Sequence, residues 1–419
     1  MIEIQPRAII YNKAKVPGSK SHTHRTELMA ALSDGECHIK GALKSEDTLL
    51  TAAALRDMGI SVTDRNETFV IMGKGGDLSP CGSPIYLGNS GTSMRLLTGF
   101  CALGKGSYTL TGTKRMQERP VGDLLEGLKS AGVKAISIEG NGCPPVQIMG
   151  GSLYGGKTEI DCGISSQFLS SLLIVSPFAK ETMDIWVTKG PVSKPYIDLT
   201  VDVMDQFGVK VERDGYNRFR VPAGQRYRSG EYAVEPDASN AGYFWGAAAI
   251  TGGTVVVDGV FPDSRQGDVK LAGIFEQMGC KVTTEKFGIA VKGGELKAVD
   301  VDMAAMPDMV PTLAVCAAYA KGKTVIRNIH HLRAKESDRI QAVINELTKM
   351  GIEADYIDEV LVIQGGCPHG AEIDTYDDHR IAMSFAMAGL ATPGIYIKDE
   401  NCVAKSFPNY WDVFETLGR

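Results

Sequence analysis

Basic, amide and hydroxyl side chains collect at the starts of several predicted helices, where they could hold an anion. Four of these openings carry such groups: Lys20, Ser21 and Arg25; Asn89, Gly91, Thr92 and Arg95; Ser165, Ser166 and Gln167; His379 and Arg380. A helix start has unsatisfied N–H groups and about half a positive charge. Ordinary capping accounts for any one opening alone. The four together predict a cleft for a ligand with more than one anionic group.

More charged residues lie outside these openings. They come from GTKRMQERP (112–120), VSKPY (192–196), RAKESDR (333–339) and Lys405. Arginine suits bidentate contacts to phosphate or carboxylate, and lysine acts as a movable point charge. Two carboxyl groups, Asp308 and Glu336, are candidates for proton transfer. From the residues alone, Asp308 could instead cap a helix and Glu336 could belong to a surface ion pair.

Composition and motifs argue against several classes of protein. The 44 Lys and Arg against 50 Asp and Glu give a net charge of −6, which disfavours a general nucleic-acid or polybasic membrane binder. GFCALGKG and AAYAKGKT fail as phosphate loops, and no dinucleotide or serine-hydrolase motif fits. Nine dispersed cysteines and the lack of HExxH predict no disulfides, metal or cofactor. With no secretory signal or membrane-length apolar stretch, we expect a reduced, cytoplasmic protein.

The elements that must position these groups recur along the chain. An amphipathic run that ends in Gly and precedes an alternating apolar stretch occurs six times, at Gly59, Gly132, Gly208, Gly279, Gly351 and Gly418. Gly at this place suits the left-handed residue that ends a helix, so each copy predicts helix, Gly stop and strand. An Asp near the front of five runs suits an N-cap or first helical turn: Asp47, Asp123, Asp198, Asp268 and Asp338.

A second series of predicted helices runs in phase with the first. These helices start near residues 21, 90, 165, 237, 307 and 377 and become almost wholly apolar, as expected for helices buried on most sides. The chain therefore contains six copies of a unit of roughly 70 residues. This period is too long for a solenoid, which favours two domains of three units each.

Taken together, the motifs resemble those of the 5-enolpyruvylshikimate-3-phosphate synthases, within the enolpyruvyl transferase family. The resemblance rests on PGSKSHTHR, GNSGTSMRLL, RMQERP, SSQFL, VSKPY, MPDMV, KESDR, DDHR and KSFPNYW, in the family's order from Val16 to Trp411. It implies an α/β (α+β) fold of two globular domains, each an inside-out α/β barrel of three repeated units, joined by a double-crossover hinge. We expect the N-terminal domain over 18–230 and the C-terminal domain over 1–17 plus 231–419.

The resemblance also implies a reaction. The family transfers the enolpyruvyl group of phosphoenolpyruvate to the 5-hydroxyl of shikimate 3-phosphate by addition and elimination, on the route to chorismate and the aromatic amino acids. A transferase with these two small-molecule substrates is therefore expected. Because Gly91 is retained as in glyphosate-sensitive members, we expect glyphosate to compete with phosphoenolpyruvate. We also expect a monomer that binds neither nucleic acid nor membrane.

Residue by residue, the resemblance divides the candidate groups between the two substrates. Those implied for phosphoenolpyruvate are Lys20, Asn89, Gly91, Arg115, Gln167, Arg339, Arg380 and Lys405. Those implied for shikimate 3-phosphate are Lys20, Ser21, Arg25, Ser165, Ser166, Gln167, Ser193, Tyr196, Asp308, His331 and Lys335. Asp308 is the implied proton acceptor and Glu336 the implied acid/base at the methylene carbon, with Lys20 as a third catalytic group.

Two departures from the family pattern and three alternatives stay open. His331 stands where a familiar version has Asn, although it could still donate one hydrogen bond, and Leu96 stands where many members have Pro. UDP-N-acetylglucosamine enolpyruvyl transferase shares the fold and donor, but its usual loop cysteine is absent from GTKRMQERP. An RNA 3′-phosphate cyclase would need a basic surface. A non-catalytic anion-binding scaffold would bind both ligands without turnover.

Overall fold

The computed structural model describes residues 1–65 and 68–418, and the chain divides into two compact units. The N-terminal unit is Gly18–Val234, and the C-terminal unit combines Met1–Pro17 with Glu235–Arg419. Each unit has its own buried apolar core. The predicted boundary after residue 230 falls too early, because β14 (Gly230–Ala233) pairs in parallel with β3 (Glu36–Lys40) of the N-terminal unit. Residues 231–234 therefore belong to the N-terminal unit.

The N-terminal unit contains three sheets of four strands. In spatial order the first is β14, β3, β5 (Thr68–Met72) and β4 (Ser61–Arg65). The second is β6 (Ile85–Tyr86), β7 (Gly106–Thr111), β9 (Val146–Gly150) and β8 (Lys134–Ser137). The third is β10 (Gly156–Asp161), β11 (Met183–Lys189), β13 (Arg218–Val221) and β12 (Glu212–Asp214).

The C-terminal unit contains two sheets of four strands and one of three. The first is β16 (Lys281–Glu285), β17 (Gly288–Lys292), β15 (Thr254–Val257) and β2 (Tyr11–Ala14). The second is β18 (Asp300–Asp302), β19 (Lys323–Arg327), β21 (Val360–Gln364) and β20 (Ala354–Ile357). The third is β1 (Ile2–Ile4), β23 (Ile395–Ile397) and β22 (Ala371–Ile373).

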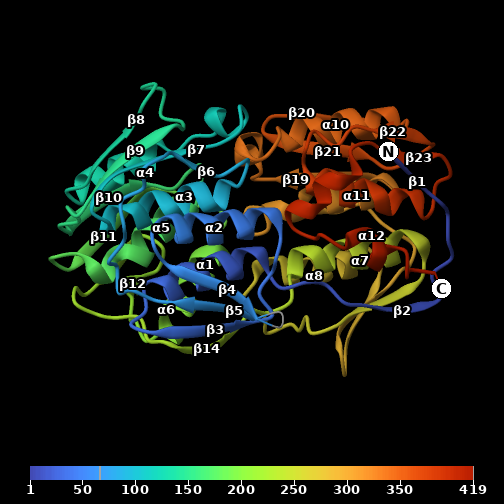
Figure 1. The fold of residues 1–419 in the computed structure, drawn as a ribbon. Helices are drawn as coiled ribbons and strands as arrows, with labels where there is room; N and C mark the ends of the chain where they lie inside the picture. The colour runs from blue at the N-terminus through green and yellow to red at the C-terminus, as the bar shows by residue number, and fades with distance from the viewer. Residues whose placement is uncertain (66–67, 419) are drawn as a thin grey trace. The chain divides into compact units, whose positions relative to one another are not determined.

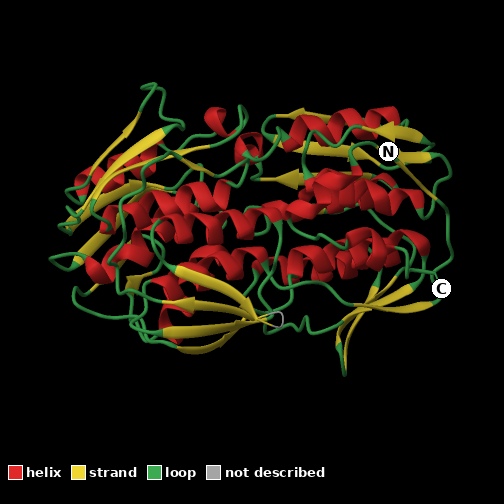
Figure 2. Cartoon of the chain, viewed as in Figure 1, coloured by secondary structure: helices red, strands yellow, loops and turns green. Residues whose placement is uncertain are grey.

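The sheets share one topology. Each four-stranded sheet has one parallel pair followed by two antiparallel pairs, as in the ladder of β14, β3, β5 and β4. The three-stranded sheet has the parallel pair, β22 with β23, and one antiparallel pair, β23 with β1. Strand pairing therefore confirms the predicted repeat in five full copies and a sixth that lacks one strand. Within the described ranges the sheets of a unit are separate and open at both ends, so no continuous hydrogen-bonded barrel closes. Figure 2 shows the sheets at the periphery of each unit and helices inside.

Two helices accompany each sheet (Figure 1). The buried series is α1 (Lys20–Ala31), α3 (Gly91–Phe100), α5 (Gln167–Val175), α7 (Ala238–Thr251), α9 (Val310–Ala318) and α11 (His379–Gly389). These starts agree with the predicted ones to within three residues. The second series is α2 (Glu46–Asp57), α4 (Gly122–Ser130), α6 (Pro195–Gln206), α8 (Leu271–Gln277), α10 (Arg339–Lys349) and α12 (Tyr410–Phe414). Among the described residues, no helix has the length and apolar character needed to cross a membrane.

The glycine series explains why the helices of the second series end where they do. All six predicted glycines have φ between +77° and +104°, the left-handed region in which a Cβ would be strained. The predicted position of the aspartates, at the N-cap or in the first helical turn, is confirmed. Asp338 caps α10 by accepting the Gln341 N–H at 3.1 Å, and Asp47, Asp123 and Asp198 lie in the first turns of α2, α4 and α6. Asp268 lies in the first turn of the 3-10 helix Gly267–Lys270, which leads into α8.

Candidate active site

Three cations surround Asp308 in the C-terminal unit. Pro307 begins the short 3-10 turn that carries Asp308 to the start of α9. The Asp308 carboxylate accepts hydrogen bonds from Arg339 Nη1 at 2.8 Å and from Arg380 Nη2 at 2.8 Å. Lys335 Nζ lies 3.4 Å from Asp308 Oδ1. Burial alone would raise the pKa of Asp308, but the three cations outweigh it and hold that pKa well below its usual range. Asp308 is therefore ionised and strongly paired.

Arg339 joins the predicted acid and base. It is the first residue of α10 and is almost fully buried. Besides Asp308, its guanidinium donates to Glu336 at 2.7 Å and to both carboxylate oxygens of Asp378 at 2.8 and 3.2 Å. Burial opposes its charge, yet these carboxylates raise the pKa of Arg339. Glu336 stands three residues before Arg339 in the sequence, and the fold brings Asp308 to the same guanidinium.

Asp378 fixes the start of α11 and was not predicted as a site residue. It is fully buried and caps the helix by accepting the Arg380 N–H at 3.0 Å. It also accepts from the Ser337 hydroxyl at 3.0 Å, so the starts of α10 and α11 are linked. The DDHR motif contained this residue, and the rule that Asp precedes a helix could have identified it.

His331 lies buried beside this cluster, in the 3-10 helix His330–Ala334. Burial, with Lys335 as the next cause, lowers the pKa of His331 to about 4, so the imidazole is neutral near pH 7. Its Nε2 is buried and, within the part of the chain that the structure describes, makes no hydrogen bond. The His-for-Asn departure thus leaves a polar atom available beside Lys335.

Lys405 is the last residue of the 3-10 helix Glu400–Lys405 and is also buried.

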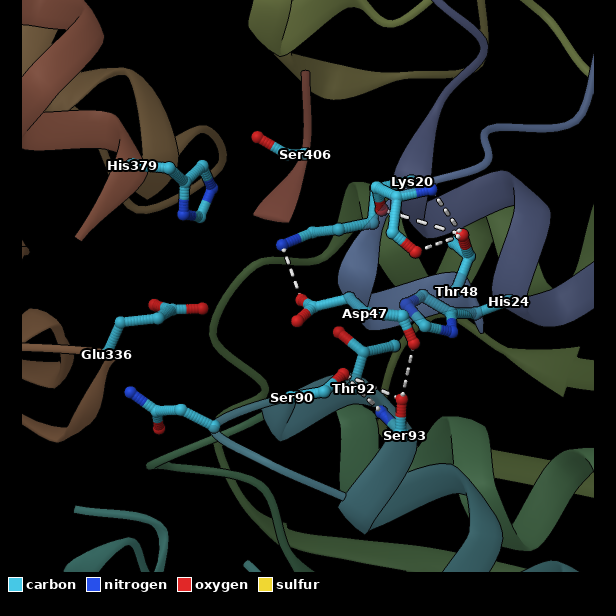
Figure 3. A network of polar contacts seen from close by, with 12 residues as sticks. Lys20, His24, Asp47, Thr48, Ser90, Thr92, Ser93, Glu336, His379 and Ser406 are labelled. Carbon is cyan, nitrogen blue, oxygen red and sulfur yellow. Dashed lines mark hydrogen bonds and ion pairs between the residues drawn. The ribbon is translucent and has the colours of Figure 1, made fainter. Parts of the chain in front are cut away.

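In the N-terminal unit, Lys20 is held by a carboxylate. Ser19 caps α1, and Lys20 follows as its first residue. Its ammonium lies 3.0 Å from Asp47 Oδ2, and both side chains are buried (Figure 3). The sequence correctly placed Asp47 at the start of a helix, which is α2. It did not predict that Asp47 pairs with Lys20. This ion pair fixes the position of the Lys20 ammonium.

Hydroxyl groups surround this ion pair. His24 Nδ1 lies 2.9 Å from the Thr51 hydroxyl, which lies 2.8 Å from that of Ser93. Ser93 in turn contacts the Ser90 hydroxyl at 2.6 Å and donates to the backbone carbonyl of Asp47 at 3.2 Å (Figure 3). Burial lowers the pKa of His24 to about 3, so this imidazole is neutral. The network ties α1, α2 and α3 together at their N-terminal ends.

Arg25 forms hydrogen bonds with other residues of the N-terminal unit. Its guanidinium has no exposed surface and donates to the Thr200 hydroxyl at 2.7 Å and the Ser170 hydroxyl at 3.3 Å. It also donates to the backbone carbonyls of Ser21 and Tyr196 at 2.8 and 3.2 Å. Arg25 thus links α1 to α5 and α6. Its predicted contact with shikimate 3-phosphate stays a prediction.

The predicted hydroxyl and amide groups lie around the start of α5. Ser166 is its N-cap residue, and Ser165 accepts the Gln167 N–H at 3.2 Å. Gln167 accepts from Arg95 at 3.0 Å and donates to the Thr92 hydroxyl at 3.0 Å, which joins the openings of α3 and α5. Ser193, before α6, is buried with φ +53°, a strained value for a non-glycine residue. Tyr196, in the first turn of α6, is half-buried.

Arg119 lies against Asn89 and Gly91. Its buried guanidinium donates to the backbone carbonyl of Asn89 at 2.9 Å and to the side-chain carbonyl at 3.1 Å. A Cβ built on Gly91 would lie 2.3 Å from Arg119 Nη2, so only glycine allows this approach. Arg115 is partly exposed and pairs with Glu118 at 3.1 Å. Both arginines stand in RMQERP, and only the fold distinguishes them.

Within the described residues, no group of three or more His, Cys, Asp or Glu could hold a metal ion. Each unit instead offers buried cations paired with carboxylates at helix starts. The C-terminal cluster contains Asp308, Glu336, Lys335, Arg339, Arg380 and Asp378, and the N-terminal group contains Lys20, Asp47, Asn89, Gly91, Arg119 and Gln167. Such arrangements can bind polyanions and move protons.

Comparison with known proteins yields one consistent result. The family described as EPSP synthase (3-phosphoshikimate 1-carboxyvinyltransferase) matches residues 4–414. A 3-phosphoshikimate 1-carboxyvinyltransferase of Syntrophobacter fumaroxidans is 44% identical over 417 residues, covering 99% of each chain. One from a Sulfurovum species is 43% identical over 424 residues, again covering 99% of each. An EPSP synthase structure from Acinetobacter baumannii is similar with a TM-score of 0.83 at 33% identity, covering 99% of this chain and 97% of that one.

Proposed function

Since the chain belongs to the EPSP synthase family, we propose that it transfers the enolpyruvyl group of phosphoenolpyruvate to the 5-hydroxyl of shikimate 3-phosphate and releases phosphate. The observation that carries this proposal is the cluster around Arg339. There, two carboxyl groups suited to proton transfer, Asp308 and Glu336, lie among cations suited to a phosphate and a carboxylate.

The reaction needs one proton acceptor and one proton donor. The 5-hydroxyl gives its proton to Asp308 as its oxygen bonds to C2 of phosphoenolpyruvate, and Glu336, in its protonated form, gives its proton to C3. The C–O bond to phosphate then breaks in the tetrahedral intermediate, and C3 returns its proton to Glu336 as the double bond forms again. The charge on the donor's phosphate and carboxylate must be held throughout, which is the task of the arginines and lysines. The proton that Asp308 accepted passes to the departing phosphate, which returns Asp308 to its ionised form.

The resemblance assigns residues of this chain to each substrate. For phosphoenolpyruvate we keep Lys20, Asn89, Gly91, Gln167, Arg339, Arg380 and Lys405. The position of Arg119 against Gly91 supports adding Arg119 to this set, while Arg115 stays a prediction from the resemblance. For shikimate 3-phosphate we keep Ser21, Arg25, Ser165, Ser166, Ser193, Tyr196, His331 and Lys335. The buried Nε2 of His331 supports its place in that set.

Phosphate release from phosphoenolpyruvate tests the proposal. Shikimate 3-phosphate is the acceptor in one reaction, and UDP-N-acetylglucosamine is the acceptor in a parallel one. We expect release with shikimate 3-phosphate only. Release with the sugar nucleotide only would overturn the acceptor assignment. Binding of both proposed substrates with no release in either reaction would indicate a scaffold without chemistry.

We further propose inhibition by glyphosate that is competitive with phosphoenolpyruvate, and action in a reducing compartment such as the cytoplasm. The first rests on Gly91 at the start of α3, which places backbone beside a buried guanidinium. The second is supported by the nine cysteines, all of which are free thiols in the structure. A monomeric state stays a prediction from the resemblance. Steady-state kinetics at varied phosphoenolpyruvate and gel filtration test these points.

A further inference from the structure

The chain's own carboxylates occupy most of the donor groups of Arg339. Its guanidinium has five N–H groups. One Nη1 group donates to Asp308, one Nη2 group to Glu336, and Nε with the second Nη2 group to Asp378. Four of the five are therefore engaged by three carboxylates before any ligand enters. An incoming anion that uses this guanidinium must compete with one of them.

The three carboxylates are not equally held. Asp378 has no exposed surface, and it is fixed by the Ser337 hydroxyl and the Arg380 N–H at the start of α11. The side chains of Asp308 and Glu336 are 14% and 10% exposed. Asp378 is thus the fixed support of Arg339, while Asp308 and Glu336 hold its outer N–H groups from the more accessible side.

Asp308 and Glu336 are also the groups proposed to carry protons, and their present partners oppose that task. A carboxylate paired with three cations has little affinity for a proton, and the pKa of Asp308 is accordingly held well below its usual range. Base catalysis requires that these cations be neutralised by something other than Asp308. The negative charges of the donor substrate would do this.

We propose that phosphoenolpyruvate binds to Arg339 by displacing Asp308 and Glu336. This one exchange of anions seats the donor, frees Asp308 to accept a proton, and lets Glu336, released from the charge of Arg339, take up from solvent the proton that it gives to C3. This inference rests on the proposed function. In the free protein Asp308 and Glu336 act as internal stand-ins for the donor's anionic groups. They keep Arg339 compensated in a buried place where an unpaired charge would be costly. They also delay proton transfer until the donor is bound.

The exchange makes a distinctive prediction about binding. If a residue holds the donor, removing its charge weakens the binding of the donor to the protein. If a residue competes with the donor, removing its charge strengthens that binding. Glu336→Gln keeps the size of the side chain but weakens its hold on Arg339, because a neutral acceptor forms a weaker hydrogen bond than an ionised one. Phosphoenolpyruvate should therefore bind about tenfold more tightly to Glu336→Gln than to the wild type, although turnover is lost.

Two control variants separate displacement from a general effect of charge. Asp378→Asn removes an anion from the same guanidinium, but it loosens the support of Arg339 and should weaken phosphoenolpyruvate binding. Glu372→Gln removes the exposed carboxylate that pairs with Lys398 at 3.2 Å in β22, and it should leave binding unchanged. A gain of affinity in Glu336→Gln alone identifies Glu336 as a competitor.

Isothermal titration calorimetry of the full chain with phosphoenolpyruvate measures these affinities, and circular dichroism checks folding. If Glu336→Gln does not fold, Asp308→Asn makes the same test, with the same expected gain. Equal or weaker binding by the folded variant overturns the exchange. Titration with inorganic phosphate separates this outcome from a failure of the proposed function. If the wild type does not use phosphoenolpyruvate, a gain of phosphate affinity in Glu336→Gln still supports the exchange, and its absence refutes it.

Discussion

Replacement of Arg119 by Ala tests whether the fold identifies the correct arginine in RMQERP. Arg119 is buried and lies against Asn89 and the start of α3, whereas Arg115 is partly exposed and paired with Glu118. If the Arg119 guanidinium makes one charged hydrogen bond to phosphoenolpyruvate, its loss removes about 1.5–3 kcal/mol of binding free energy. This corresponds to an affinity loss of about 10- to 150-fold.

The same substitution in place of Arg115 has a smaller expected effect. Arg115 is partly exposed, and solvent-screened ion pairs such as its pair with Glu118 contribute about 0–1 kcal/mol. If its contact with phosphoenolpyruvate is screened in the same way, Arg115→Ala should weaken phosphoenolpyruvate binding by at most about fivefold. Calorimetric titration and the KM for phosphoenolpyruvate measure both variants under one set of conditions. The KM for shikimate 3-phosphate serves as an internal control.

Arg119→Ala also leaves two carbonyl groups of Asn89 without their donor, which could lower stability instead of affinity. Arg119→Lys controls for this, since it retains the charge but loses the fork of N–H groups. We expect an intermediate loss of affinity with a melting temperature close to that of the wild type. A larger affinity loss in Arg115→Ala than in Arg119→Ala would refute the reasoning from burial and contact.

Three further outcomes are expected. Gly91→Ala should raise the KM for phosphoenolpyruvate about tenfold in steady-state kinetics, because its Cβ would lie 2.3 Å from Arg119 Nη2 and displace the guanidinium. Asp308→Ala should lower kcat by about 10²–10⁴-fold while calorimetry still detects phosphoenolpyruvate binding, because general base catalysis is lost. Glu27→Leu should raise the free energy of unfolding at pH 8 by about 1 kcal/mol or more in urea titrations, because it removes a buried carboxyl group.

The sign of the Glu27 effect follows from its surroundings. Glu27 is fully buried on α1, and neither of its carboxylate oxygens has a hydrogen-bond partner among the residues that the structure describes. Burial raises its pKa well above the ordinary 4.5, although Arg56 partly opposes this. Because the folded protein holds the proton more tightly, the stability from this group is complete below pH 4.5 and is lost as the pH rises toward the folded pKa. A wild-type advantage over Glu27→Leu that grows with pH would contradict this assignment.

The repeated helices and their ends could be predicted because their signals are local. A glycine such as Gly208 ends α6 through its own backbone conformation, and the apolar run over α5 predicts burial from composition alone. The same applies to Asp338, which caps a helix that begins at the next residue. These features need no knowledge of which elements pack together.

The partners of the site residues could not be predicted in this way. Lys20 and Asp47 are 27 positions apart, and Arg339 and Asp378 are 39 apart, so their pairing depends on how two helices meet. The choice between Arg115 and Arg119 depends on the short 3-10 turn Met116–Glu118, which leaves one arginine exposed and carries the other inward. The resemblance to a family implied a role for Asp308. Its low pKa depends on Arg380, Lys335 and Arg339, which only the folded chain brings to it.

The pairing of β1 and β2 has a consequence for the order in which the protein folds on the ribosome. Ile2 pairs with Ile397 and Lys13 with Val256, so the first segments to be synthesised find their partners only after the N-terminal unit is complete. The N-terminal unit, by contrast, has all its strands once β14 has emerged. Nascent chains should therefore contain a folded N-terminal unit with an unpaired leader. β2 can pair once β15 has emerged, soon after the N-terminal unit is complete, whereas β1 can pair only when β23 becomes available.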